Sequence, residues 1–259
     1  MHRILKFLRP QLWCCAMFAL SGAVSTAPAK DVAGYADDAK NYVLAPLHWD
    51  QTDWAWFAGS IAAVAASHHY DDHVRNHFGP QRFESGDPHS LRDFVPVAAL
   101  GGAVLLQGLM GDKPALSTSF DMMEAAVFAG GTSFALKFVA GRRRPNETLD
   151  SSRWFKSGDS FPSTHTAVAF AAATAFAERD SENPIARRIV AYGLATGTAY
   201  LRLKDNQHWL SDAVAGAAIG ISTGLYVNHR GVGSKHSASN WSIAPMGDGI
   251  GIAYTHELR

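Results

Sequence analysis

Six long apolar segments constrain this sequence more than any other feature. Each is longer than an ordinary β-strand and carries apolar residues three and four positions apart, the spacing of one face of an α-helix. The segments span residues 54–69, 94–110, 120–139, 165–178, 185–200 and 209–227. The sequence therefore predicts an all-α fold, a helical bundle of about six core helices. Polar residues near the helix starts predict N-caps at Asp53, at Ser119 or Asp121, and at Thr164.

The N-terminus has the pattern of a secretory signal. A basic start with Arg3, Lys6 and Arg9 precedes a short apolar stretch at 12–24 and small residues ending at Ala29. We predict a signal peptide over residues 1–29 and an exported protein, periplasmic or associated with the cell envelope. The alternative is an uncleaved anchor, but the apolar stretch is shorter than the ~20 residues needed to span a bilayer.

The remaining chain divides into a polar stretch and helical domain at 30–230 and a different tail at 231–259. Gly and Ser are frequent at 231–240, which is typical of a linker. Beyond it, short alternating segments flank Gly247-Asp248-Gly249, a turn signal that predicts a small β-hairpin.

Composition narrows the partners of the chain. Its formal net charge is zero, which gives no general attraction for nucleic acid, so we expect no nucleic-acid partner. The only cysteines, Cys14 and Cys15, lie in the predicted signal, so the rest of the chain has no disulfide or thiolate site. Charges such as Glu124 and Asp212 within the predicted helices, with a mean hydropathy of −0.06, favour a soluble or peripherally attached bundle over six membrane spans. The oligomeric state stays open.

The first cluster of interest is Lys137, Arg144 and Pro145. If the helix continued through Gly141, the seven-residue spacing would place both cations on one face, and Pro145 would then end the helix. Such a pair can hold a tetrahedral anion, because arginine supplies a bidentate fork and lysine a mobile charge. The alternative is a solvated basic face or a charge cluster beside a membrane.

The second cluster is Pro162-Ser163-Thr164-His165, directly before a helical pattern. A helix N-terminus offers unpaired N–H groups and the positive end of the dipole to an anion. Ser163 and Thr164 can add hydroxyl donors, and His165 can give a proton to a leaving oxygen. The alternative is a capping sequence with an incidental histidine.

The third cluster contains Arg202, His208 and Asp212. On a helix, the four-residue spacing would place His208 and Asp212 on one face, where the carboxylate fixes the imidazole tautomer and leaves the other nitrogen free to attack. Arg202 adds a further phosphate ligand. An ordinary surface His–Asp pair is the alternative. Together the three clusters supply what phosphoryl transfer without a metal cofactor requires.

The three clusters resemble the tripartite signature of the type 2 phosphatidic acid phosphatase and vanadium haloperoxidase superfamily. That signature reads Lys-x6-Arg-Pro, Pro-Ser-Gly-His and Ser-Arg-x5-His-x3-Asp. The first part matches fully, whereas Thr164 replaces the usual glycine and Leu201 the usual serine. Thr164 adds a Cβ where glycine allows close approach or positive φ, so it costs little only at a regular helix start.

The resemblance implies a helical bundle with the active site at one end. By position, it implies phosphate binding by Lys137, Arg144, Ser163, Thr164 and Arg202. It also implies that His208 is the nucleophile, His165 the general acid and Asp212 the partner that orients His208. We therefore expect an exported, metal-independent phosphatase without a cofactor, acting on phosphomonoesters or diphosphates of small molecules or lipids, with peripheral membrane contact.

Two other functions stay open. A vanadate-dependent haloperoxidase would use the same residues, although the short chain favours a phosphatase. A catalytically lapsed envelope binding or structural protein would account for Thr164 and Leu201, but has no chemical reason to retain both histidines.

Two further signals have ordinary explanations. His69 and His73 lie one helical turn apart, but a polar helix end explains this segment better than a metal site. Trp49, Trp54 and Trp56 could mark a membrane interface, and we expect them instead to be core or partly buried aromatics.

Overall fold

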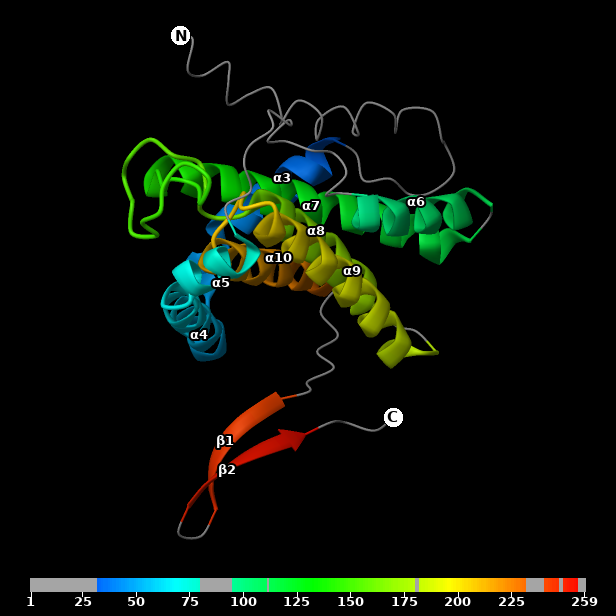
Figure 1. Cartoon of the computed structure of the whole chain (residues 1–259). Coiled ribbons are helices and arrows are strands. Elements are labelled where there is room, and N and C mark those ends of the chain that lie inside the picture. The colour runs from blue at the N-terminus through cyan, green and yellow to red at the C-terminus, as the bar shows by residue number, and fades with distance from the viewer. Residues whose placement is uncertain are drawn as a thin grey trace. The chain divides into compact units, whose positions relative to one another are not determined.

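The computed structural model describes residues 32–79, 95–110, 112–179, 182–231, 240–246 and 249–255 (Figure 1). The chain divides into two compact units, residues 1–228 and 229–259. The predicted signal peptide and most of the predicted linker, residues 232–239, lie outside the described residues.

The first unit is all-α where it is described, as the periodicity predicts. Its helices are α3 (Val32–Leu44), the 3-10 helix η2 (Ala45–His48), α4 (Gln51–His68), α5 (Asp71–Phe78), α6 (Val95–Leu109), α7 (Lys113–Ala140), α8 (Thr164–Ala177), α9 (Pro184–Lys204) and α10 (Leu210–Gly231). The six predicted segments correspond to α4 and α6 to α10. The sequence did not predict α3 or α5. In α5, acidic Asp71 and Asp72 at the start and basic Arg75 and His77 near the end complement the helix dipole.

The predicted N-caps are wrong, by a few residues in α4 and α8 and by about two helical turns in α7. In α4 the cap is Asp50, whose Oδ1 accepts from the N–H groups of Thr52 (2.7 Å) and Asp53 (2.9 Å). Asp53 completes a capping box, since its Oδ2 accepts from the Asp50 N–H at 3.1 Å. The residue predicted as cap is therefore the third residue of the helix.

The caps of α7 and α8 also precede the predicted positions. Helix α7 is capped by Asp112 and begins at Lys113, before Ser119 and Asp121. The predicted caps lie too far along the chain because the periodic apolar pattern used for the prediction starts only after the first turns of the helix. Helix α8 is capped by Ser163, and Thr164 is its first helical residue.

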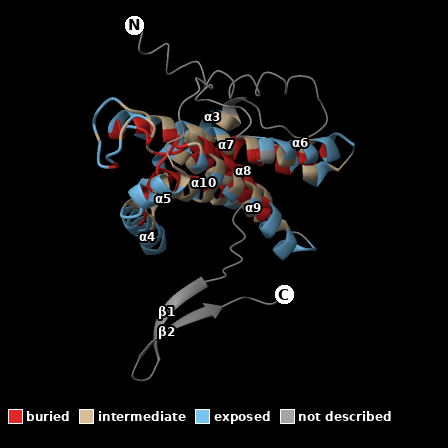
Figure 2. Cartoon of the chain, in the orientation of Figure 1, coloured by how far each residue is buried: buried red, intermediate tan, exposed pale blue. Residues whose placement is uncertain are grey.

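Helix α8 is the centre of the first unit. It packs against α6, α7 and α9, and Figure 2 shows buried residues concentrated on α7, α8 and α10. Its sequence is apolar all round, which suits a helix enclosed by others. The buried alanines are Ala167, Ala169, Ala171, Ala172, Ala173, Ala175 and Ala177.

Close contact between α8 and α10 depends on glycine. A Cβ at Gly216 would lie 2.6 Å from the carbonyl oxygen of Ser163, and a Cβ at Gly220 would lie 2.4 Å from that of Ala167. Both distances are too short for any larger residue. The glycines therefore bring the start of α10 against the start of α8, where the second and third sequence clusters lie.

Two of the described helices are long and apolar enough to cross a membrane, judged by length and composition alone. They are α7, over Lys113–Ala140, and α10, over Leu210–His229. Within the fold, 33% and 50% of their apolar stretches are buried, and a core helix has the same length and composition. Both are compatible with association with the cell envelope.

Helix α4 has an exposed aromatic cluster at its start. Trp54 is 51% and Trp56 73% exposed, so the expectation of core or partly buried aromatics holds only for Trp49. The rings of Trp49 and Trp54 lie 5.0 Å apart and those of Trp54 and Phe57 5.9 Å apart. The aromatic cluster thus presents exposed apolar side chains at Trp54, Trp56 and Phe57.

The second unit contains the predicted hairpin. Strands β1 (Asn240–Met246) and β2 (Gly249–Thr255) pair antiparallel, in a register from Asn240 opposite Thr255 to Met246 opposite Gly249. The two turn residues 247–248 lie outside the described residues.

Candidate active site

The first cluster lies where α7 ends. Gly141 takes the left-handed conformation with φ 52°, and its N–H donates to the Lys137 carbonyl at 3.0 Å, which terminates the helix. This conformation favours glycine. The prediction that Lys137 and Arg144 share a helix face is therefore wrong. Lys137 is in the last turn of α7, and Arg144 is in the loop that follows.

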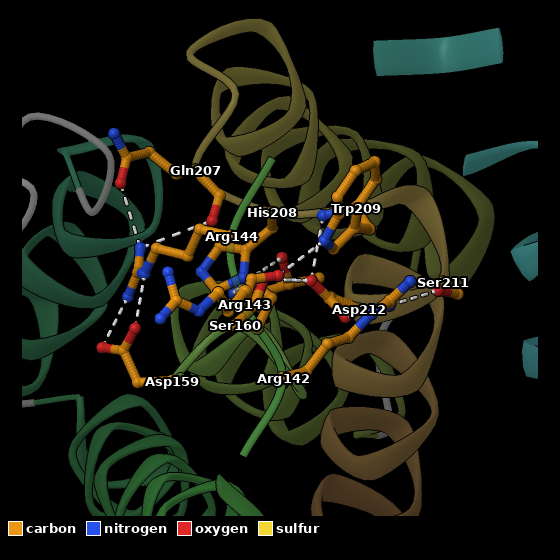
Figure 3. Close-up of polar contacts among 12 residues, drawn as sticks. Arg142, Arg143, Arg144, Asp159, Ser160, Gln207, His208, Trp209, Ser211 and Asp212 are labelled. Atoms are coloured by element: carbon orange, nitrogen blue, oxygen red, sulfur yellow. Dashed lines mark hydrogen bonds and ion pairs between the residues drawn. The ribbon is translucent and has the colours of Figure 1, made fainter. Parts of the chain in front are cut away.

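The two cations nevertheless meet, at Asp159. Arg144 donates from Nε to Asp159 Oδ1 at 2.7 Å and from Nη2 to Oδ2 at 2.9 Å. Lys137 Nζ donates to the Asp159 carbonyl oxygen. Arg144 Nη1 also donates to Gln207 Oε1 at 3.0 Å, and Figure 3 shows Arg144 held between Asp159 and Gln207. Lys137 and Arg144 are therefore brought together by their contacts with Asp159 and not by a shared helix face.

The second cluster begins α8. Ser163 is fully buried; its Oγ lies 2.9 Å from Thr166 Oγ1, and its N–H donates to the Asp212 carbonyl at 3.0 Å. Thr164 opens α8 as a regular helical residue and is absent from the positive-φ residues of the described chain. The change from glycine therefore imposes no backbone strain at this position. His165 follows in the first turn and is buried.

The third cluster spans the end of α9 and the start of α10. Arg202 is in the last turn of α9 and 1% exposed, beside the half-buried Leu201. His208 precedes α10, which begins at Leu210, so the prediction that His208 and Asp212 share a helix face is wrong. His208 Nδ1 lies 3.6 Å from Asp212 Oδ2, which is too far for a hydrogen bond.

Asp212 is held by groups other than His208. Its Oδ2 accepts from Ser160 Oγ at 2.5 Å and from the Trp209 N–H at 2.9 Å, and its Oδ1 accepts from Arg142 Nη1 at 2.6 Å. These contacts fix the carboxylate beside the imidazole (Figure 3). The carboxylate remains fully buried and directed at the Nδ1 side of His208.

Arg142 is the important residue that the sequence did not reveal. It is fully buried, and its guanidinium bridges Asp212 to Asp71, with Nη2 2.6 Å from Asp71 Oδ2. It also donates to the Ser151 carbonyl oxygen at 2.6 Å and lies 4.3 Å from the Trp154 ring centroid. In the sequence it stands in a run of three arginines, and no local pattern separates it from its exposed neighbour.

Asp71 connects the α4–α5 corner to α10. Its Oδ1 accepts from the Ser211 N–H at 2.8 Å and its Oδ2 from Ser211 Oγ at 2.6 Å. His68 Nδ1 lies 2.8 Å from Asp71 Oδ2. The polar segment at 67–73 therefore anchors the site. In the described part of the chain, no three His, Cys, Asp or Glu side chains gather as metal ligands would.

Burial and the clustered Arg and Lys side chains shift the pKa values of the titratable groups in the site. Burial, followed by the charges of Arg144 and Arg202, lowers the pKa of His208 well below 6.5. Burial and the charge of Arg202 lower the pKa of His165 in the same direction. Burial and the charge of Arg144 lower the pKa of Lys137 to about 7. Both histidines are therefore neutral at neutral pH.

The pKa of Asp159 is lowered, whereas burial alone raises the pKa of a carboxylic acid. Burial alone would raise its pKa, but the hydrogen bonds and charge of Arg144, with the charge of Lys137, hold the pKa well below the ordinary value. Asp159 is therefore negatively charged at neutral pH.

Comparison with known proteins finds a family that matches the part of the chain containing this site. The PAP2 superfamily matches residues 119–244, which include all three clusters. The chain carries a PAP2 superfamily domain. A lipid A 1-phosphatase from Porphyromonas gingivalis is 41% identical over 96 residues, 37% of this chain and 20% of that protein. The chain thus aligns with only about a fifth of its relative's length. No solved structure matches the chain. The PAP2 domain runs from within α7 into β1.

Proposed function

We propose that the PAP2 domain is a metal-independent phosphatase that hydrolyses phosphomonoesters or diphosphates through a phosphohistidine intermediate on His208. The observation that carries this proposal is the placement of three cations around two neutral histidines. Lys137, Arg144 and Arg202 all lie close enough to lower the pKa of both rings. A neutral imidazole surrounded by cations is suited to attack an anionic phosphoryl group.

In the proposed first step, the cations bind the phosphoryl oxygens, with Ser163 and the backbone of Thr164 at the helix N-terminus assisting. Asp212 faces Nδ1 of His208, so Nε2 is the nitrogen that attacks phosphorus. The bond between phosphorus and the ester oxygen breaks, and the leaving oxygen takes a proton from His165. In the second step, His165 removes a proton from water, water attacks phosphorus, and the phosphorus–nitrogen bond breaks to release phosphate.

The low pKa of His165 is compatible with its role as acid once substrate is bound. The cations that lower this pKa are those proposed to hold the phosphoryl group. A bound dianion offsets their charge and raises the pKa of His165 toward its ordinary range. Protonation of the acid is thereby coupled to occupation of the site.

Export and a lipid substrate belong to the same proposal. The signal at 1–29 supports transport out of the cytoplasm, and the relative's name supports a phosphorylated lipid as substrate. The exposed aromatic cluster of α4 supports peripheral contact with a membrane surface.

The test is phosphate release by the purified chain in the presence of a metal chelator. Aryl phosphate, lipid phosphates and lipid diphosphates serve as substrates, and His208→Ala serves as the inactive partner. Release by the wild type alone, suppressed by vanadate, supports the proposal. Peroxidase activity after vanadate loading without phosphate release would favour the haloperoxidase, and neither activity from a folded chain would favour a lapsed enzyme.

A further inference from the structure

Asp159 engages the cations that the proposed function assigns to the phosphoryl group. Its carboxylate accepts from Nε and Nη2 of Arg144 at 2.7 and 2.9 Å, and its carbonyl oxygen accepts from Nζ of Lys137. In Figure 3 the carboxylate lies across the fork of the Arg144 guanidinium. One residue therefore contacts two of the three proposed phosphate ligands.

A carboxylate and a phosphoryl group compete for the same donors. Both present a pair of oxygens that matches the parallel N–H groups of a guanidinium. The remaining Nη1 of Arg144 donates to Gln207, at 3.0 Å from Oε1. A phosphoryl group that binds the fork of Arg144 must therefore displace the side chain of Asp159.

The surroundings of Asp159 permit that displacement. Its side chain is 31% exposed, whereas that of Arg144 is 8% exposed, so the carboxylate contacts solvent to a much greater extent than the guanidinium does. The backbone on either side is fixed, since the Lys156 N–H donates to Gly141 O at 2.8 Å and the Ser160 N–H to Arg142 O at 2.9 Å. The side chain can turn outward while the loop stays in place.

Asp212, the other carboxylate of the site, has a different environment. It is fully buried and has its own counter-charge in Arg142, 2.6 Å away. Asp159 instead takes its counter-charge from a cation that substrate needs. The two carboxylates therefore differ in function: Asp212 is a fixed part of the site and Asp159 a mobile one.

We propose that Asp159 is a displaceable internal anion that competes with the phosphoryl group for Arg144 and thereby weakens the hold of the site on substrate and on product phosphate. The proposal rests on the phosphate-binding role assigned to this site. Three cations without such a competitor would retain free phosphate, whereas an internal carboxylate that returns to Arg144 promotes its release.

The experiment is calorimetric titration of the full chain with inorganic phosphate. Wild type is compared with Asp159→Asn, Asp159→Ala and the control Asp150→Asn, whose carboxylate pairs with Arg153 at 3.1 Å on the surface. We expect Asp159→Asn to lower the Kd of phosphate by about five- to tenfold, and Asp159→Ala by at least as much. Asp150→Asn leaves the Kd unchanged. Circular dichroism verifies that each variant is folded.

Two outcomes overturn the proposal. Unchanged or weaker phosphate binding in both Asp159 variants would mean that the residue only positions Arg144. Absence of phosphate binding in all four proteins would mean that the cations form no anion site. Tighter binding by the variants without phosphate release from any substrate would support this proposal while refuting the phosphatase activity.

Discussion

Arg142 and Asp212 form a fully buried ion pair, with Nη1 2.6 Å from Oδ1. The same guanidinium also pairs with Asp71, so one cation contacts two buried carboxylates. Charges enclosed in this way are tolerated only when they are paired and hydrogen-bonded. Arg142 thereby holds Asp212 beside His208 and the start of α10 beside the α4–α5 corner.

Removal of Arg142 is expected to be severe. Arg142→Leu leaves Asp71 and Asp212 without a counter-charge and is expected to lower the free energy of unfolding by about 3–5 kcal/mol. Arg142→Lys keeps the charge but cannot bridge both carboxylates, so we expect partial rescue of stability and little activity. Chemical denaturation measures the effect, with the exposed neighbour Arg143→Leu as control. Equal losses in the two leucine variants would contradict the bridging role.

The buried histidines are expected to make stability depend on pH. Because the folded-state pKa values of His165 and His208 lie below 6.5, the unfolded chain binds more protons than the folded chain below that pH. The free energy of unfolding therefore falls by about 1.4 kcal/mol per pH unit for each histidine as the pH falls below about 6.5. Urea denaturation at about pH 7.5 and about pH 5.5 tests this. The variant with both histidines replaced by glutamine should have a clearly flatter profile.

Activity is expected to decline on the alkaline side. Lys137 has a pKa of about 7, lowered first by burial and then by Arg144, and its protonated form is the one that binds phosphate. The value of kcat/KM, which reports the free enzyme, should therefore fall about tenfold per pH unit above about pH 7. Lys137→Arg, whose side chain keeps its proton, should extend the plateau to higher pH. If kcat/KM of this variant declined over the same pH range as that of the wild type, Lys137 would not be the cause of the decline.

His165 is expected to matter in proportion to the difficulty of the leaving group. Alkyl phosphates require protonation of the departing oxygen, so His165→Ala should reduce their hydrolysis by about 10²- to 10⁴-fold. Aryl phosphates with acidic phenols need little protonation, so their kcat/KM, which covers the steps up to loss of the phenol, should fall far less. The slope of log kcat/KM against leaving-group pKa measures the difference. A slope unchanged from the wild type would remove His165 from the role of acid.

The contact between α8 and α10 provides a test of packing. Gly220→Ala places a Cβ 2.4 Å from the Ala167 carbonyl oxygen, and overpacking of this kind costs about 1–3 kcal/mol. We expect Tm to fall by about 3–10 °C. The control is Gly193→Ala on α9, where a Cβ meets nothing within 4 Å and alanine favours the helix. A lower Tm in the control than in Gly220→Ala would contradict the packing described for α10.

Periodicity predicted α4 and α6 to α10 because each has a long run of apolar residues, but α4 is not a core helix, since Ser67 is its one buried residue. It missed α5, whose residues are mostly polar, and it set the caps too late because capping residues stand outside the apolar pattern. For α7 the error reached Asp112, several residues before the predicted caps. Helix ends depend on single side-chain contacts, which the periodic pattern does not contain.

The sequence predicted that the charged and titratable residues of the site lie near one another, but it did not predict how they are arranged. Lys137, Arg144, Arg202, His165 and His208 do lie close enough to affect each other's charge. Local spacing failed where the backbone leaves the helix, at Gly141 and before Leu210. The bridging role of Arg142 arises from partners far along the chain, so no pattern within its own segment could distinguish it.

Those distant partners also determine when the site forms. Arg142 is separated from Asp71 by 71 positions and from Asp212 by 70, and Asp71 is separated from Ser211 by 140. Contacts of such long range require large loops to close, and they form more slowly than the turns of a helix. During synthesis, α4 to α9 leave the ribosome before Asp212 does. A nascent chain that stops short of α10 therefore contains α4 to α9 but lacks Asp212, so it cannot form the buried Arg142–Asp212 ion pair.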